Sequence, residues 1–198
     1  MHHLSKKGQE TRQAILMCAF DLFHERGIHA TTVDDILRKS GAGKSQFYHY
    51  FKNKQDIIHE LLQLAYQMIK DGQTHFQPIH TWDDFRGWLD ASIEEIEGHG
   101  CSRACPIGQI ICQISEDDVL LHQDIKLVFG AMKDYPKNFF IALQARGELS
   151  DNADPDEMAD MCIATMQGSA MIAKVNQNIT VSKKTANHLF AYMHSFVK

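Results

Sequence analysis

The run SGAGKSQFYHYFKNKQDII, residues 40–58, combines small, aromatic and polar residues within a few helical turns. Its aromatic and polar members alternate along the chain: Lys44, Gln46, Phe47, Tyr48, His49, Tyr50 and Phe51. A helix buried on all sides would not contain the polar residues, and a solvated helix would not contain the aromatic residues. The pattern therefore predicts a thin helix with one side in a core and the other side facing a partner.

The residues before this run predict two further short helices. Thr32 and Asp35 have the spacing of a capping box, so a helix is expected to begin at Val33 and to end at Gly41. An amphipathic segment at residues 9–26 precedes it and stops at Gly27. Two short helices joined by residues 40–43 have the size and spacing of a helix-turn-helix.

The second of these short helices has the side chains of a DNA-reading helix. With Gly43 at its cap, Phe47 and the Tyr50–Phe51 pair point into a three-helix core. The outward side chains are Lys44, Ser45, Gln46, Tyr48 and His49. Lysine and glutamine at a helix N-terminus suit base edges in the major groove. Lys52 and Lys54, at the start of the next helix, suit backbone phosphates.

The segment TTVDDILRKSGAGKSQFYHYFKNKQDI, residues 31–57, resembles the N-terminal motif of the TetR family of bacterial transcriptional repressors. The resemblance covers about residues 12–61. It implies that these side chains contact DNA: Thr32, Lys44, Ser45, Gln46, Tyr48, His49, Tyr50 and Lys54. Two residues depart from the family pattern, since Leu37 stands where alanine is usual and Gly43 where a polar residue is usual.

Charge is distributed unevenly along the chain. Residues 1–54 hold nine Lys and Arg against five Asp and Glu, whereas the rest holds eleven against twenty. Residues 1–54 therefore carry a net charge of +4 and residues 55–198 a net charge of −9, which together give −5 for the chain. A basic module on an acidic body suits contact with a polyanion at one end only.

The rest of the chain predicts further helices and no strands. Their expected ranges are about 54–70, 82–97, 106–115, 119–146, with a bend near Pro136, 155–175 and 182–196. The expected fold is thus all-α with about nine helices. A helix-turn-helix domain is expected at residues 1–52, with a disordered arm up to about Gln9, and a ligand-binding and dimerisation domain at residues 53–198.

The family resemblance implies a homodimer that binds a palindromic double-stranded operator, represses transcription and releases DNA when a small inducer binds its body. The sequence itself offers a dimer element, because residues 158–175 are apolar over most of a helix circumference and Gly168 permits close approach. Residues 185–196 are its expected partner in a four-helix bundle. Burial of both segments within one chain is the alternative.

Large adaptable side chains predict where an apolar inducer binds. The expected pocket residues are Tyr66, Phe85, Trp88, Leu89, Cys105, Phe129, Met132 and Met166. The same residue types equally suit an ordinary core, which is the alternative. Cys105, beside Arg103 and before a helix, resembles the thiol of electrophile-sensing members of one TetR branch, with Cys101 as its resolving partner. An ordinary packing role explains Cys105 equally simply.

Other functional classes find less support in the sequence. A thiol enzyme using Cys105 with His99 or His122 lacks any further catalytic motif, and a pure interaction module leaves the basic helix unexplained. The spacing of His99, Cys101 and Cys105 matches no standard zinc site, so neither metal nor cofactor is expected. The polar N-terminus, the absence of a 20-residue apolar run and the unpatterned cysteines predict a cytoplasmic protein that does not enter membranes.

Overall fold

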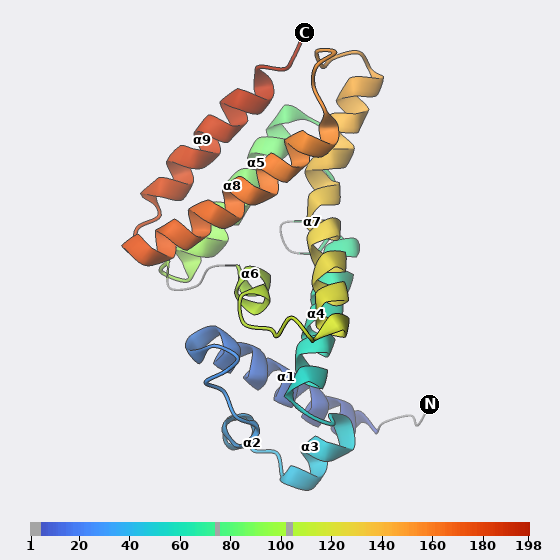
Figure 1. Ribbon diagram of the computed structural model, residues 1–198, viewed down its shortest axis with the longest axis vertical. Helices are drawn as coiled ribbons and strands as arrows, with labels where there is room; N and C mark the ends of the chain where they lie inside the picture. Colours follow the sequence, from blue (N-terminus) through green and yellow to red (C-terminus); the bar gives the residue numbers. More distant parts are fainter. Residues whose placement is uncertain (1–4, 74–75, 102–104) are drawn as a thin grey trace. The chain divides into compact units, whose positions relative to one another are not determined.

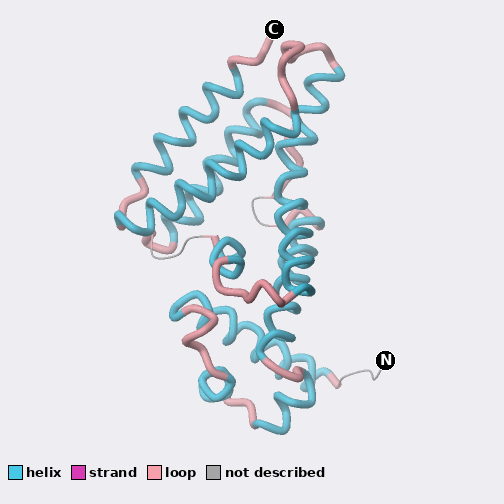
Figure 2. The backbone as a smooth tube through the Cα atoms, in the orientation of Figure 1, coloured by secondary structure: helices cyan, strands magenta, loops and turns pink. Residues whose placement is uncertain are grey.

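A computed structural model describes residues 5–73, 76–101 and 105–198, and within these ranges the fold is all-α, as predicted (Figures 1 and 2). Its helices are α1 (Lys6–Arg26), α2 (Val33–Ser40), α3 (Lys44–Tyr50), α4 (Lys54–Lys70), α5 (Trp82–Gly98), α6 (Pro106–Ile111), α7 (Val119–Ala145), α8 (Pro155–Asn176) and α9 (Thr180–His194). Extended pairing within the described residues is confined to one antiparallel bridge between Leu149 and Val197.

Several helix ends differ from the prediction. The first helix begins at Lys6 rather than Gln9, because the Ser5 hydroxyl accepts the Gly8 N–H and caps it. The expected disordered arm therefore does not extend past Ser5, and residues 1–4 lie outside the described residues. The sixth helix stops at Ile111 rather than Ser115, and α7 continues through Pro136.

The chain divides into two compact units, and each is described by itself. The first unit comprises residues 1–65 and 109–125, and the second comprises residues 66–108 and 126–198. The division falls inside α4, α6 and α7, so the helix-turn-helix shares its unit with a short segment far along the chain. The predicted domain boundary between residues 52 and 53 stays a prediction.

The core of the first unit is small and fully buried. Ile15 of α1, Ile36 of α2, Phe47 of α3, and Ile57 and Leu62 of α4 are each 0% exposed. Burying a side chain of this size contributes roughly 1.5–3 kcal/mol, so these contacts stabilise helices too short to persist alone. The core thereby fixes the angles between α1, α2 and α3.

The core of the second unit is richer in aromatic rings. Helices α5, α8 and α9 pack against one another, and α7 adds further side chains to the same cluster (Figure 1). Phe85 stacks on Phe139 at a centroid distance of 5.7 Å and on Trp88 at 5.9 Å. We call this cluster the aromatic core; its buried aromatic members are Phe85, Trp88, Phe139 and Phe140.

Candidate nucleic-acid interface and effector site

Local capping defines the two helices of the helix-turn-helix. The Thr32 hydroxyl accepts the Asp35 N–H at 3.1 Å, and the Asp35 carboxylate accepts the Thr32 N–H at 3.0 Å, which completes the predicted capping box. The Thr32 hydroxyl also donates to the Asp35 carboxylate at 2.6 Å, and this bond, together with the one from the Thr32 N–H, lowers the pKa of Asp35 below its ordinary value. Gly41 ends α2 with φ of 71°, a left-handed conformation in which glycine avoids the Cβ clash.

The start of α3 is capped from within the helix. Gly43 has no side chain to cap with, and the Gln46 side-chain oxygen instead accepts the Gly43 N–H at 2.9 Å. The absence of a polar residue at position 43 is thus offset three residues later. Gln46 keeps its side-chain NH₂ group for a partner outside the protein.

The third helix has the two-sided character that its sequence predicts. Phe47 is 0% exposed and Phe51 is 1% exposed, with their rings 5.7 Å apart in the core. On the other side Tyr48 is 60% exposed, and Lys44, Ser45, Gln46 and His49 are exposed as well, whereas Tyr50 is half-buried. A row of exposed hydrogen-bonding side chains lies on a helix whose other face is anchored.

Exposed neighbours engage this row only weakly. Lys44 Nζ lies 3.1 Å from an Asp34 carboxylate oxygen, but both side chains are mostly exposed. Such surface pairs contribute about 0–1 kcal/mol and are readily exchanged. A phosphate group is therefore able to compete for the Lys44 ammonium.

The structure gives Lys54 a role that the sequence did not indicate. Its ammonium donates to the Ile28 carbonyl at 2.6 Å and to the Thr31 carbonyl at 3.0 Å. Burial lowers the pKa of Lys54 below its ordinary value. Two of its three donors hold the loop before α2, which leaves one for the predicted phosphate contact.

Sequence reasoning missed a polar link to this loop from a distant segment. The Gln113 side-chain oxygen accepts the Ile28 N–H at 2.7 Å. The same oxygen would lie 2.7 Å from a Cβ added at Gly27, where φ is 86°. Glycine is thus required at position 27 both by backbone conformation and by the close approach of Gln113.

A second link, also missed, joins α4 to the start of α7 within the first unit. Asp124 is 3% exposed, and its two carboxylate oxygens meet His59 Nδ1 at 2.5 Å and Gln63 Nε2 at 2.6 Å. His59 and Gln63 are one turn apart and therefore share a helix face. A lone polar residue in a helix gives no sequence signal of such pairing.

Four of the predicted pocket residues belong to the core of the second unit. Phe85 and Leu89 are 0% exposed, Trp88 is 6% exposed and Met166 is 9% exposed. All four are members of one apolar cluster. Within the described residues, Trp88 Nε1 is buried and has no hydrogen-bond partner.

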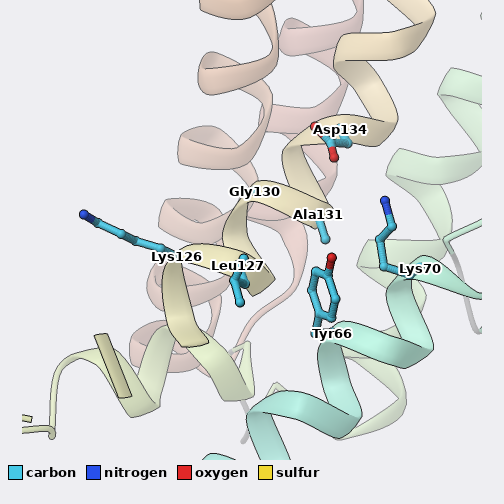
Figure 3. A pocket seen from close by; sticks show the side chains of 7 residues that line it. All are labelled: Tyr66, Lys70, Lys126, Leu127, Gly130, Ala131 and Asp134. Carbon is cyan, nitrogen blue, oxygen red and sulfur yellow. The ribbon is translucent and has the colours of Figure 1, made fainter. Parts of the chain in front are cut away.

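The other predicted pocket residues are placed differently. Tyr66 lines a hollow of about 190 Å³ between α4 and α7 (Figure 3). Its other lining residues are Lys70, Lys126, Leu127, Gly130, Ala131 and Asp134, and Lys126 extends away from the Tyr66 ring. Phe129 and Met132 are half-buried on α7 and do not line this hollow.

The cysteines are all free thiols. Cys105 is half-buried immediately before α6, and Cys101 is 6% exposed with a left-handed φ of 56°. Arg103, the predicted electrostatic partner of Cys105, lies outside the described residues. A redox role for Cys105 and Cys101 stays a prediction.

The described residues also bear on metal binding and on membrane insertion. No three His, Cys, Asp or Glu side chains among them are grouped so as to hold a metal ion. None of the described helices combines the length and apolar character that crossing a membrane requires.

Comparison with known proteins agrees with this geometry. Residues 15–61 match the model of bacterial regulatory proteins, tetR family, and residues 84–189 match the tetracyclin repressor-like C-terminal domain. The transcriptional regulator AcuR of Cereibacter sphaeroides is 26% identical over 181 residues, which cover 82% of this chain and 76% of AcuR. The transcriptional repressor DhaR of Mycobacterium sp. strain GP1 is 25% identical over 176 residues, which cover 84% of each chain.

A solved structure extends the likeness to three dimensions. The crystal structure of a TetR transcriptional regulator from Chloroflexus aurantiacus superposes with a TM-score of 0.82 at 24% identity, covering 98% of each chain. Two family models together span the helix-turn-helix and most of the second unit. The chain is thus a member of the TetR family, whose proteins are DNA-binding transcriptional regulators and not enzymes.

Proposed function

We propose that this protein is a homodimeric repressor that binds a palindromic operator in the cytoplasm and leaves it when a small apolar or electrophilic inducer binds the second unit. The observation that carries the proposal is the exposed row on α3, opposite the buried Phe47 and Phe51. The row offers donors and acceptors to base edges, and the core beneath fixes its orientation. The residues proposed to contact DNA are Thr32, Lys44, Ser45, Gln46, Tyr48, His49, Tyr50 and Lys54.

Binding to the DNA upstream of its own gene tests the proposal. Fluorescence anisotropy with a labelled fragment should give a specific complex, and Gln46→Ala or Tyr48→Phe should each weaken it by about 1–3 kcal/mol. Gln123→Ala, an exposed glutamine on α7, is the matched control and should bind like wild type. If the Gln46→Ala, Tyr48→Phe double variant keeps full operator affinity, α3 is not the recognition helix.

An exposed apolar stripe on α8 supports the dimer. Met161, Ile172 and Val175 are 42%, 49% and 82% exposed, and with Gly168 they follow one another at spacings of seven, four and three residues. These spacings place all four on one face of a helix. Large apolar side chains left in water favour association, and open space around Gly168 permits close approach of a second α8.

The oligomeric state checks this part of the proposal. Gly168→Glu should give monomers in sedimentation velocity and lose tight operator binding, because one protomer then holds a single half-site. Gly87→Glu is the matched control, since Gly87 is an exposed helical glycine on α5 with open space around it. A wild-type protein that sediments as a monomer at micromolar concentration would contradict the dimer.

The inducer is proposed to bind in the second unit. Phe85, Trp88, Leu89 and Met166 gather in one cluster there, and α4 runs from Lys54 beside the helix-turn-helix into that unit. A ligand that prefers the DNA-free state by a few kcal/mol suffices to release the operator, and operator DNA must weaken ligand binding by the same factor.

A further inference from the structure

The indole N–H of Trp88 is the least satisfied polar group in the aromatic core. Trp88 is 6% exposed, and its Nε1 atom finds no hydrogen-bond acceptor among residues 5–73, 76–101 and 105–198. A buried donor without an acceptor is rare in folded proteins, because its lost hydration is not recovered. An acceptor supplied from outside the chain would remove this deficit.

The surroundings of Trp88 restrict what that acceptor can belong to. Trp88 stacks on Phe85 at 5.9 Å, and the cluster to which it belongs is otherwise built from apolar side chains. The buried polar residues described in the second unit are Ser169 and Ser182, and both hydroxyls already donate to backbone carbonyls. No buried charge among the described residues of that unit is present to compensate an ionised ligand.

The same cluster contains side chains that can yield to an occupant. Met158 and Met166 are 4% and 9% exposed members of it, and both lie on α8. Methionine is unbranched with several rotatable bonds, so it can move aside for a small molecule more easily than a branched residue. An apolar molecule that enters the cluster therefore meets one directional contact, the Trp88 N–H.

We infer that Trp88 is a specificity-determining residue of the inducer site, and that it donates a hydrogen bond to a neutral, largely apolar or aromatic ligand carrying a carbonyl-type oxygen. The inference rests on the proposed function, in which an inducer binds the second unit. It adds the chemical class of the ligand and the atom that selects it. The hydrogen bond distinguishes a carbonyl compound from a hydrocarbon of the same shape. A carboxylate of similar size is disfavoured because the described residues of the second unit hold no buried charge to compensate it.

The experiment follows the two indole N–H resonances of the intact protein, labelled with ¹⁵N at tryptophan, since Trp82 and Trp88 are the only tryptophans in the sequence. The probes are acetophenone, the nearly isosteric isopropylbenzene, and benzoate. Trp88→Phe and Trp82→Phe assign the resonances. Acetophenone should bind saturably and shift the Trp88 indole proton resonance downfield, as a new hydrogen bond does. Benzoate should leave that resonance unshifted.

Affinity in the variant gives the decisive comparison. Trp88→Phe should weaken acetophenone relative to isopropylbenzene by about five- to tenfold, the effect of losing one neutral hydrogen bond. Trp82→Phe should leave that ratio unchanged. If Trp88→Phe does not fold, the wild-type indole shift with the three probes still decides the inference.

Three outcomes would overturn the inference: an unmoved Trp88 resonance with every probe, an affinity ratio unaffected by Trp88→Phe, or a response to benzoate in place of acetophenone. These measurements contain no DNA, so they fail independently of the operator experiment. If the protein binds acetophenone through Trp88 but does not bind the DNA upstream of its gene, the proposed function is refuted and the ligand site at Trp88 stands.

Discussion

Asp124 in the first unit and Trp88 in the second differ in how their buried polar atoms are satisfied. In the first unit, Asp124 is 3% exposed and both of its carboxylate oxygens are hydrogen-bonded, and the buried Thr31 hydroxyl donates to the Gly27 carbonyl at 2.8 Å. In the second unit, the Trp88 N–H is buried without an acceptor among the described residues. The first unit joins its parts by directional contacts, whereas the second relies on an apolar cluster in which the described residues leave the Trp88 N–H without an acceptor.

This difference corresponds to two kinds of recognition. A helix that reads base edges must be held at a fixed angle. Lys54, which donates hydrogen bonds, and Gln113 and Asp124, which accept them, restrict the elements around it. A site for a small molecule must admit an occupant, and apolar contacts are less directional than hydrogen bonds. The comparison predicts that polar substitutions cost more in the first unit than in the second.

The largest loss of folding stability is expected on replacing Asp124. Replacing it with alanine removes a buried carboxylate and leaves His59 and Gln63 without their acceptor. The free energy of unfolding, measured by urea titration, should fall by about 3 kcal/mol. Gln123→Ala, the exposed neighbouring position on α7, should stay within about 0.5 kcal/mol of wild type. Equal values for the two variants would remove the contrast between the units.

Within the first unit, the sequence predicts local features better than distant contacts, for a physical reason. Capping residues, the glycine turn and the alternating faces of α3 are local properties, so Thr32, Gly41 and Phe47 could be placed from their neighbours alone. The carboxylate of Asp124 and the amide of Gln113 find partners 65 and 85 residues away. Nothing local at either residue indicates such a partner.

An effector site is harder to predict because it depends on how several helices pack. The apolar character of Phe85, Leu89 and Met166 indicates burial, and the structure buries all three. Whether a buried apolar residue contacts a ligand depends on which neighbours leave room or unsatisfied groups. The orphan donor of Trp88 becomes visible only when every potential acceptor has a position.

The second largest loss of folding stability is expected on replacing Gly27. Alanine there must adopt φ near 86° and place its Cβ 2.7 Å from the Gln113 side-chain oxygen. Gly27→Ala should lower the free energy of unfolding by about 1–3 kcal/mol. Gln113→Ala alone measures the loss of the Ile28 hydrogen bond. Combined with Gly27→Ala it also relieves the steric clash, so the double variant should lose less than the two single losses combined. Gly98→Ala, with open space around position 98, is the control and should change stability by less than 1 kcal/mol. If the loss in the double variant equals the sum of the losses in Gly27→Ala and Gln113→Ala, the Gln113 side chain does not clash with residue 27.

A smaller effect on stability, joined to one on DNA binding, is expected at Lys54. Lys54→Met keeps the apolar stem but removes the donors to the Ile28 and Thr31 carbonyls, which should cost about 1–2 kcal/mol of unfolding free energy. It should also weaken binding to all DNA sequences and flatten the salt dependence. Lys52→Met, at an exposed neighbour, should affect DNA binding with little change in stability. Indistinguishable unfolding curves for these variants would show that the two carbonyl contacts contribute nothing.

The smallest change in folding stability is expected on replacing Trp88 of the second unit. Without ligand, Trp88→Phe removes apolar area, which destabilises the fold. It also removes a buried N–H that finds no acceptor among the described residues, which stabilises the fold by about 1–3 kcal/mol. The two contributions oppose each other, so the free energy of unfolding should stay within about 1 kcal/mol of wild type. Phe139→Leu shrinks a 1% exposed ring of the same cluster with no polar atom involved, and it should cost about 1–2 kcal/mol. A larger loss for Trp88→Phe than for Phe139→Leu would mean that the indole N–H is already satisfied by a buried water, and the contrast between Asp124 and Trp88 would then disappear.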